Sequence, residues 1–179
     1  MKDKNRIITF ITVVAFLFIG LFFFAKPSQN GNKTSNIPKG SQELANSHTA
    51  INSALTAEET FYDFGTISMK NGLVKKVFKI TNPTSKDIKL PSLTTSCMCT
   101  SAYFVGLDGN KSGPFGMPGM GFVPPLNRII RAGQSANIEV VYDPNAHGPA
   151  GVGMIDRFVY LEDENNNKLQ FEIKANVTP

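Results

Sequence analysis

The sequence predicts an all-β domain, built as an antiparallel β-sandwich, behind a single N-terminal transmembrane helix. Three features of the chain lead to this prediction. An uncharged apolar run opens it, a polar segment follows, and the remaining residues show short alternating apolar runs separated by turn residues. Apolar stripes with a 3.6-residue period, which amphipathic helices require, do not occur in this last part.

The predicted transmembrane helix lies within residues 1–25. Ile7–Ala25 contains nineteen residues without a charge, and a helix of this length spans about 28 Å, close to the roughly 30 Å of a bilayer core. Lys2, Lys4 and Arg6 precede the run and place the amino terminus in the cytoplasm. We therefore expect a signal anchor in the cytoplasmic (inner) membrane, with the rest of the chain in the periplasm or outside the cell. The alternative, a cleaved signal peptide, is disfavoured by the length of the apolar run.

Residues 26–56 are predicted to be a flexible linker, because they are rich in Ser, Asn, Lys, Gly and Pro and hold few large apolar side chains. The formal net charge of +4 comes from residues 1–56, since residues 57–179 contain twelve basic and twelve acidic residues. A nucleic-acid-binding domain needs basic residues clustered on the folded part. The charge distribution therefore argues against a nucleic-acid partner.

Residues 57–179 have the size of one domain. Apolar and polar residues alternate along several segments, which is the pattern of a strand with one face in a core. The clearest case is 168–177, which the turn residues Asn165-Asn166-Asn167 join to a partner strand at 155–163. Further strands are predicted around Phe78–Ile80 and Ile138–Tyr142. Several short strands at this spacing indicate a sandwich.

One segment, residues 106–127, interrupts this pattern. Its glycines and prolines are incompatible with a regular central strand, so we expect a long loop. Phe115, Met117, Met120 and Phe122 are then expected to form an exposed apolar tip, of the kind that marks contacts with a protein partner or a membrane.

Four motifs together resemble a known family. They are Phe61-Tyr62-Asp63-Phe64-Gly65-Thr66-Ile67, Phe78-Lys79-Ile80-Thr81-Asn82, Ser96-Cys97-Met98-Cys99-Thr100 and Ala132-Gly133-Gln134-Ser135. In this order they are similar to the bacterial domain-of-unknown-function 1573 family, a group of Hydin-like, immunoglobulin-like domains, over about residues 58–177. The resemblance implies a seven-stranded immunoglobulin-like sandwich on an envelope protein and no established activity. The chain departs from the family at Met98, where glycine is usual, and in the length of residues 106–127.

Cys97 and Cys99 are the only cysteines of the chain. On a strand they would point to the same face, about 6.8 Å apart, so that a disulfide between them would be strained. We expect two small apolar thiols packed between the sheets. A thiol-redox pair is the first alternative. A copper site is the second, with candidate ligands Cys97, Cys99, Met117 and Met120, and with His147 as a further donor.

Together these observations predict a membrane-anchored extracytoplasmic module that serves in protein interaction or as a structural element. The alternative function is that of a copper-binding or thiol-redox protein using Cys97 and Cys99. No Ser–His–acid arrangement or phosphate-binding loop is evident, so we predict no catalytic residue, no cofactor, no enzymatic activity and no small-molecule substrate. The expected partners are the membrane, through the N-terminal helix, and other envelope proteins.

Overall fold

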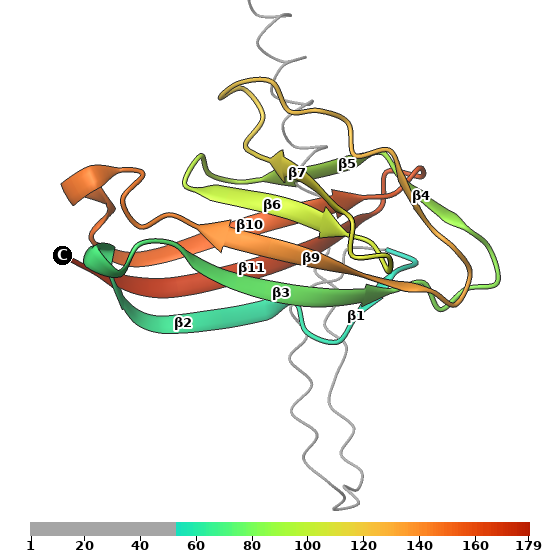
Figure 1. Cartoon of the computed structure of the whole chain (residues 1–179), viewed down its shortest axis with the longest axis horizontal. Coiled ribbons are helices and arrows are strands. Elements are labelled where there is room, and N and C mark those ends of the chain that lie inside the picture. The colour runs from blue at the N-terminus through green and yellow to red at the C-terminus, as the bar shows by residue number, and fades with distance from the viewer. Residues whose placement is uncertain (1–52) are drawn as a thin grey trace, which may run out of the picture. The chain divides into compact units, whose positions relative to one another are not determined.

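The computed structural model describes residues 53–179, which form two β-sheets packed face to face (Figure 1). The five-stranded sheet has the order β1 (Thr56–Ala57), β3 (Val74–Thr81), β9 (Ser135–Tyr142), β6 (Thr100–Val105) and β7 (Lys111–Phe115). The four-stranded sheet has the order β2 (Phe61–Ser68), β11 (Lys168–Thr178), β10 (Gly153–Glu162) and β5 (Ser92–Thr95). A third, two-stranded sheet pairs β4 (Ile88–Leu90) with β8 (Arg128–Ile130). Two short 3-10 helices are η1 (Met69–Asn71) and η2 (Gly148–Gly151).

The predicted all-β sandwich is confirmed for these residues, with two corrections. The pairing of β2 with β11 is parallel, so the four-stranded sheet is mixed and not purely antiparallel. A parallel pair needs a long connection, and the eight strands between β2 and β11 in the chain provide it. The two large sheets of residues 53–179 contain nine strands, where the family resemblance implies seven.

The core lies between the two large sheets. Burial alternates residue by residue along β9, as the sequence pattern predicts, and the predicted hairpin of residues 155–163 and 168–177 is present as β10 and β11. Phe78 on β3 and Phe171 on β11 meet across the sandwich with their ring centroids 4.9 Å apart. Glu172, expected on the solvent face of its strand, is buried instead, and its carboxylate pairs with Lys174 at 2.8 Å.

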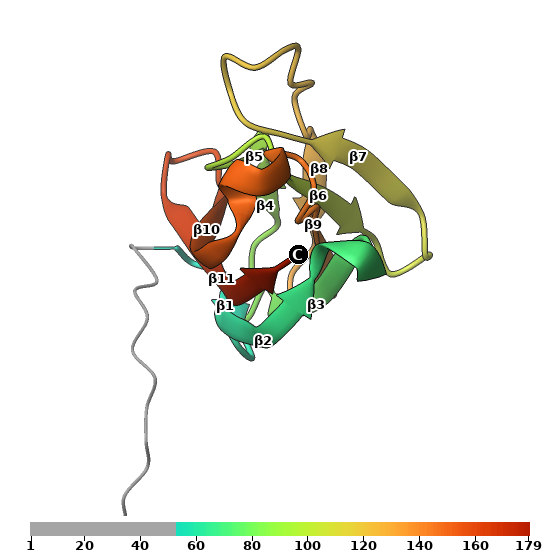
Figure 2. The same ribbon diagram turned by 90° about the vertical axis from the view of Figure 1, so that its left-hand side faces the viewer.

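The segment predicted as one long loop, residues 106–127, contains an unpredicted strand. β7 pairs with β6 through Phe115 opposite Ala102 and forms an edge of the five-stranded sheet. An edge strand tolerates Pro114, because one side of its backbone needs no ladder donor. The rest of the segment, residues 116–127, is irregular and is called the β7–β8 loop below. Figure 2 shows it rising away from both sheets.

The predicted transmembrane helix and linker lie outside the described residues. Within residues 53–179, no helix combines the length and the apolar character that crossing a membrane requires. Leu55 is buried in the core, so the folded region includes residues just before the predicted domain start at residue 57.

Candidate functional site

The two cysteines lie in a turn that connects the two sheets, and not on a strand as predicted. β5 ends at Thr95 in one sheet and β6 begins at Thr100 in the other. The buried Thr95 hydroxyl lies 3.0 Å from the carbonyl oxygens of both Cys97 and Thr100, and the Thr100 amide donates to the Cys97 carbonyl at 3.1 Å. We call residues 97–99 the Cys-Met-Cys turn. Met98 stands at its apex with 52% of its surface exposed.

A disulfide joins Cys97 to Cys99, which corrects the expectation of two packed free thiols. The turn brings the two Cα atoms to 5.2 Å, well inside the usual range for a disulfide, whereas an extended strand would hold them farther apart. The two sulfur-bearing residues differ in access. Cys99 is buried, with 2% of its surface exposed, and Cys97 is half-buried. A reagent in solution therefore reaches Cys97 more easily than Cys99.

A basic side chain stands beside each sulfur. Nε2 of His147, from the loop after β9, lies 3.3 Å from Sγ of Cys97. Nε of Arg157, from β10, donates a hydrogen bond to Sγ of Cys99 at 3.2 Å. The pair is thus flanked on one side by an imidazole and on the other by a permanent positive charge.

Three hydrogen bonds fix the loop that carries His147, and one of them ties it to the Cys-Met-Cys turn. The Asp143 amide, directly after β9, donates to the Cys99 carbonyl at 2.9 Å. The Asn145 amide donates to Oδ1 of Asp143 at 2.8 Å, and the Asn145 side chain donates to the Met69 carbonyl, also at 2.8 Å. Tyr142, at the end of β9, is buried, and this burial raises the pKa of its phenol.

The sequence offers three of these four side chains as candidates, with Cys97 and Cys99 as the main pair and His147 as a further donor. Arg157 is not among its candidates. Arg157 occupies an inward position of β10, on the same face of the strand as the buried Ile155 and Val159. The sequence signal for Arg157 was an arginine at an inward position of an alternating strand. Such a position indicates a nearby partner, because a charged group is buried only where it finds one.

The predicted methionine ligands occupy the β7–β8 loop. The loop starts beside the site, because the Thr95 amide donates to the Gly116 carbonyl at 3.1 Å. Met117 is half-buried, and Met120 is exposed. Among the His, Cys, Asp and Glu side chains of residues 53–179, one group has the spacing of a metal site, and it consists of Cys97, Cys99 and His147.

The expected apolar tip is smaller than predicted. Phe115 is the last residue of β7 and is buried in the core, which corrects its assignment to the exposed tip. Phe122 exposes 89% of its surface and Met120 exposes 58%. The exposed apolar tip of the β7–β8 loop therefore consists of these two side chains.

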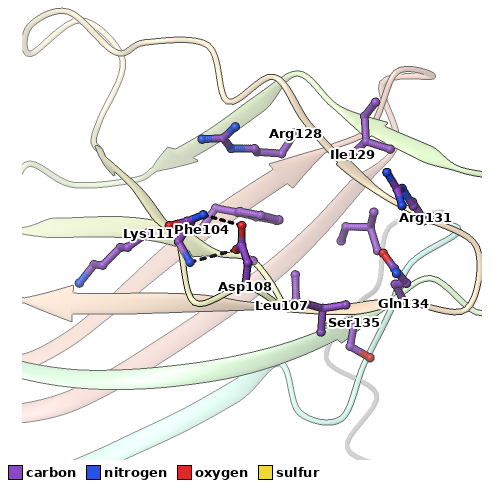
Figure 3. Close-up of a pocket in the computed structure, with 13 residues that line it drawn as sticks. Phe104, Leu107, Asp108, Lys111, Arg128, Ile129, Arg131, Gln134 and Ser135 are labelled. Carbon is purple, nitrogen blue, oxygen red and sulfur yellow. Dashed lines mark hydrogen bonds between the residues drawn. The ribbon is translucent and has the colours of Figure 1, made fainter.

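A pocket of about 650 Å³ opens at the far end of β6 from the cysteines (Figure 3). Its lining mixes charges of both signs, but several of its polar groups already have partners. Lys111 pairs with Glu139 at 2.8 Å, and Arg128 donates to the Ser112 hydroxyl. Hydrogen bonds from Asn110 lower the pKa of Asp108. We find no set of side chains lining this pocket that matches a catalytic or metal-binding arrangement.

Comparison with known proteins confirms the family resemblance over part of the chain. The model of a family described as "Protein of unknown function (DUF1573)" matches residues 55–106. This stretch runs from β1 to the end of β6 and includes both cysteines. None of the curated proteins matches the chain.

Solved structures with a similar chain path include three from different sources. A protein of unknown function from Porphyromonas gingivalis W83 shares 17% identity over 68% of this chain and 46% of its own, with a TM-score of 0.48. The secreted serine protease VesC from Vibrio cholerae shares 13% identity over 70% of this chain and 24% of its own, with a TM-score of 0.44. The ASH/PapD-like domain 7 of human CEP192 shares 14% identity over 83% of this chain and 98% of its own, with a TM-score of 0.43. The chain thus spans less than half of the first two proteins, and none of the three assigns it an activity.

Proposed function

We propose that this chain, whose residues 55–106 match the model of the DUF1573 family, is a membrane-anchored, extracytoplasmic immunoglobulin-like module that carries a thiol–disulfide exchange centre. The observation that supports this function is the Cys97–Cys99 disulfide, held between His147 and Arg157 in the turn that joins the two sheets. Disulfides persist in oxidising compartments, which agrees with an anchor formed by Ile7–Ala25.

The geometry supports attack of a partner thiolate on Cys97, with Cys99 as the leaving group. A thiolate of a partner dithiol protein attacks Sγ of Cys97, the more accessible sulfur, and forms a mixed disulfide while the Cys97–Cys99 bond breaks. Cys99 leaves as a thiolate, which Arg157 stabilises through its charge and its hydrogen bond. The second thiolate of the partner then attacks the partner's first sulfur in the mixed disulfide, and a disulfide forms within the partner. Cys97 leaves beside His147, which can donate a proton to it.

The alternative to an exchange centre is a disulfide that only stabilises the turn. Reduction of the full chain in the folded state distinguishes these two possibilities. Alkylation should find no free thiol before treatment and two after equilibration with a glutathione buffer, with circular dichroism unchanged. An exchange centre is expected to have a reduction potential above about −300 mV, whereas structural disulfides of secreted proteins lie below this value. A disulfide that resists glutathione until the protein is unfolded would contradict the proposal.

A second candidate function, protein contact through the β7–β8 loop, is favoured by the exposure of Met120 and Phe122. Exposed apolar side chains grouped on a loop commonly mark contact sites. We expect a photoreactive phenylalanine analogue in place of Phe122 to form a covalent adduct with a partner protein in intact cells. The same analogue in place of Leu73, which is also exposed and precedes β3, is the control. Equal labelling at both positions would contradict a dedicated contact site.

A further inference from the structure

The geometry points to a Cu(I) site in the reduced form of the centre, with Cys97, Cys99 and His147 as its three ligands. Sγ of each cysteine and a ring nitrogen of His147 lie within 4.8 Å of one another. The inference rests on the proposed function in one respect, because the two thiolates become available only when the disulfide is reduced.

The donor set favours Cu(I) over magnesium, calcium and a structural zinc ion. Two thiolates and an imidazole are soft and intermediate donors that suit Cu(I) and zinc, whereas carboxylate and carbonyl oxygens suit magnesium or calcium. A structural zinc site takes four protein ligands. The group found among the His, Cys, Asp and Glu side chains of residues 53–179 offers three.

The surroundings of the cysteines match the charge of such a complex. One Cu(I) and two thiolates carry a net charge of −1, and the guanidinium of Arg157, already bonded to Sγ of Cys99, balances it. A buried or half-buried charge is tolerated when a charge of opposite sign is paired with it. Arg157 therefore stabilises the loaded site without acting as a ligand.

His147 is placed for binding before the metal arrives. The loop that carries it is tied to the Cys-Met-Cys turn by the Asp143–Cys99 backbone hydrogen bond. His147 itself is exposed, so an ion can approach the site from solution. A ligand held close to its binding position loses little conformational freedom when it coordinates the metal.

Binding of Cu(I) therefore depends on the redox state of the two cysteines. Reduction adds two electrons and two protons from a dithiol reductant to the disulfide and gives two thiols. Binding of one Cu(I) releases these two protons and leaves two coordinated thiolates. The oxidised protein has no thiolate to offer, so oxidation closes the site and reduction opens it.

The test is a Cu(I) titration of the full chain, purified in detergent under anaerobic conditions, against the chromophoric competitor bathocuproine disulfonate. An aliquot of the reduced protein is first assayed for two free thiols. We expect one Cu(I) per reduced chain and none per oxidised chain, with X-ray absorption showing two sulfur ligands and one nitrogen ligand. Two free thiols without Cu(I) uptake would overturn this inference alone. A disulfide that cannot be reduced in the folded state would overturn both it and the proposed function.

A matched pair of histidine variants tests the third ligand without touching the cysteines. Loss of a residue that merely supports a metal ligand typically costs about 10- to 100-fold in affinity, so loss of a ligand should cost at least as much. We expect His147→Gln to weaken Cu(I) binding to this extent, while the thiol count stays at two. The control His48→Gln changes the other histidine of the chain, which lies in the predicted linker, and should bind as the wild type does. Equal affinities of the two variants would overturn the assignment of His147.

Discussion

In the folded protein, the thiol of Cys97 is expected to react with Ellman's reagent at least about tenfold faster than the thiol of Cys99, because exchange rates depend on access to the sulfur. Each thiol is isolated by replacing the other, with Cys99→Ser leaving Cys97 and Cys97→Ser leaving Cys99. Cys97 is half-buried, whereas Cys99 exposes only 2% of its surface. The rate constant for release of the coloured thiolate is measured for both variants by stopped flow.

Unfolding provides the control for this comparison. In concentrated urea both thiols are exposed in nearly the same local sequence, so the two variants should react at similar rates. Arg157 lies beside Cys99 and favours its thiolate form, an effect that works against the predicted order. A faster reaction of Cys99 in the folded state would therefore show that charge outweighs access, and it would reverse the direction of exchange given above.

The fold was predictable to the extent that apolar residues alternate along the chain. The alternation of Leu169, Phe171 and Ile173 specified β11 and its inward face, because the side-chain period of a strand is two. The same pattern carries no information on strand direction. The parallel pairing of β2 with β11 joins residues more than a hundred positions apart, and no local signal reports it.

The candidate site was predictable as a pair of cysteines but not as a geometry. The sequence showed that Cys97 and Cys99 are two residues apart, and the strand assumption then gave a separation too wide for an easy disulfide. The turn that shortens this separation depends on Thr95, whose side-chain hydroxyl bonds the carbonyl oxygens of Cys97 and Thr100. His147 and Arg157 come from distant positions in the chain. They lie beside the two sulfurs because β9 pairs with β6 and β10 pairs with β5.

Replacing Asn82 by alanine is expected to lower the free energy of unfolding by about 2–4 kcal/mol, the sum of lost hydrogen bonds and of buried polar groups left without a partner. Asn82 is fully buried in the turn after β3. Its amide nitrogen donates to the carbonyl oxygens of Lys86 at 2.7 Å and Ile130 at 2.9 Å. Its side-chain oxygen accepts from the backbone amide of Thr84 at 3.0 Å and from the Thr84 hydroxyl at 2.7 Å. One side chain thus joins the turn after β3 to the end of β8, two segments that no strand pairing connects directly.

Equilibrium unfolding in urea, followed by far-ultraviolet circular dichroism, measures the effect. Asn165→Ala is the matched control, because this exposed asparagine uses its backbone amide in the β10–β11 turn and alanine keeps that amide. Its effect should stay within about 0.5 kcal/mol, as for ordinary surface substitutions. Asn82→Asp provides a finer test, since it keeps an acceptor for Thr84 but replaces the donor to Lys86 and Ile130 with a buried charge. It should therefore destabilise the fold at neutral pH and recover part of the loss as acid protonates the new carboxylate. An alanine variant as stable as the control would show that the turn holds β3 and β8 together without Asn82.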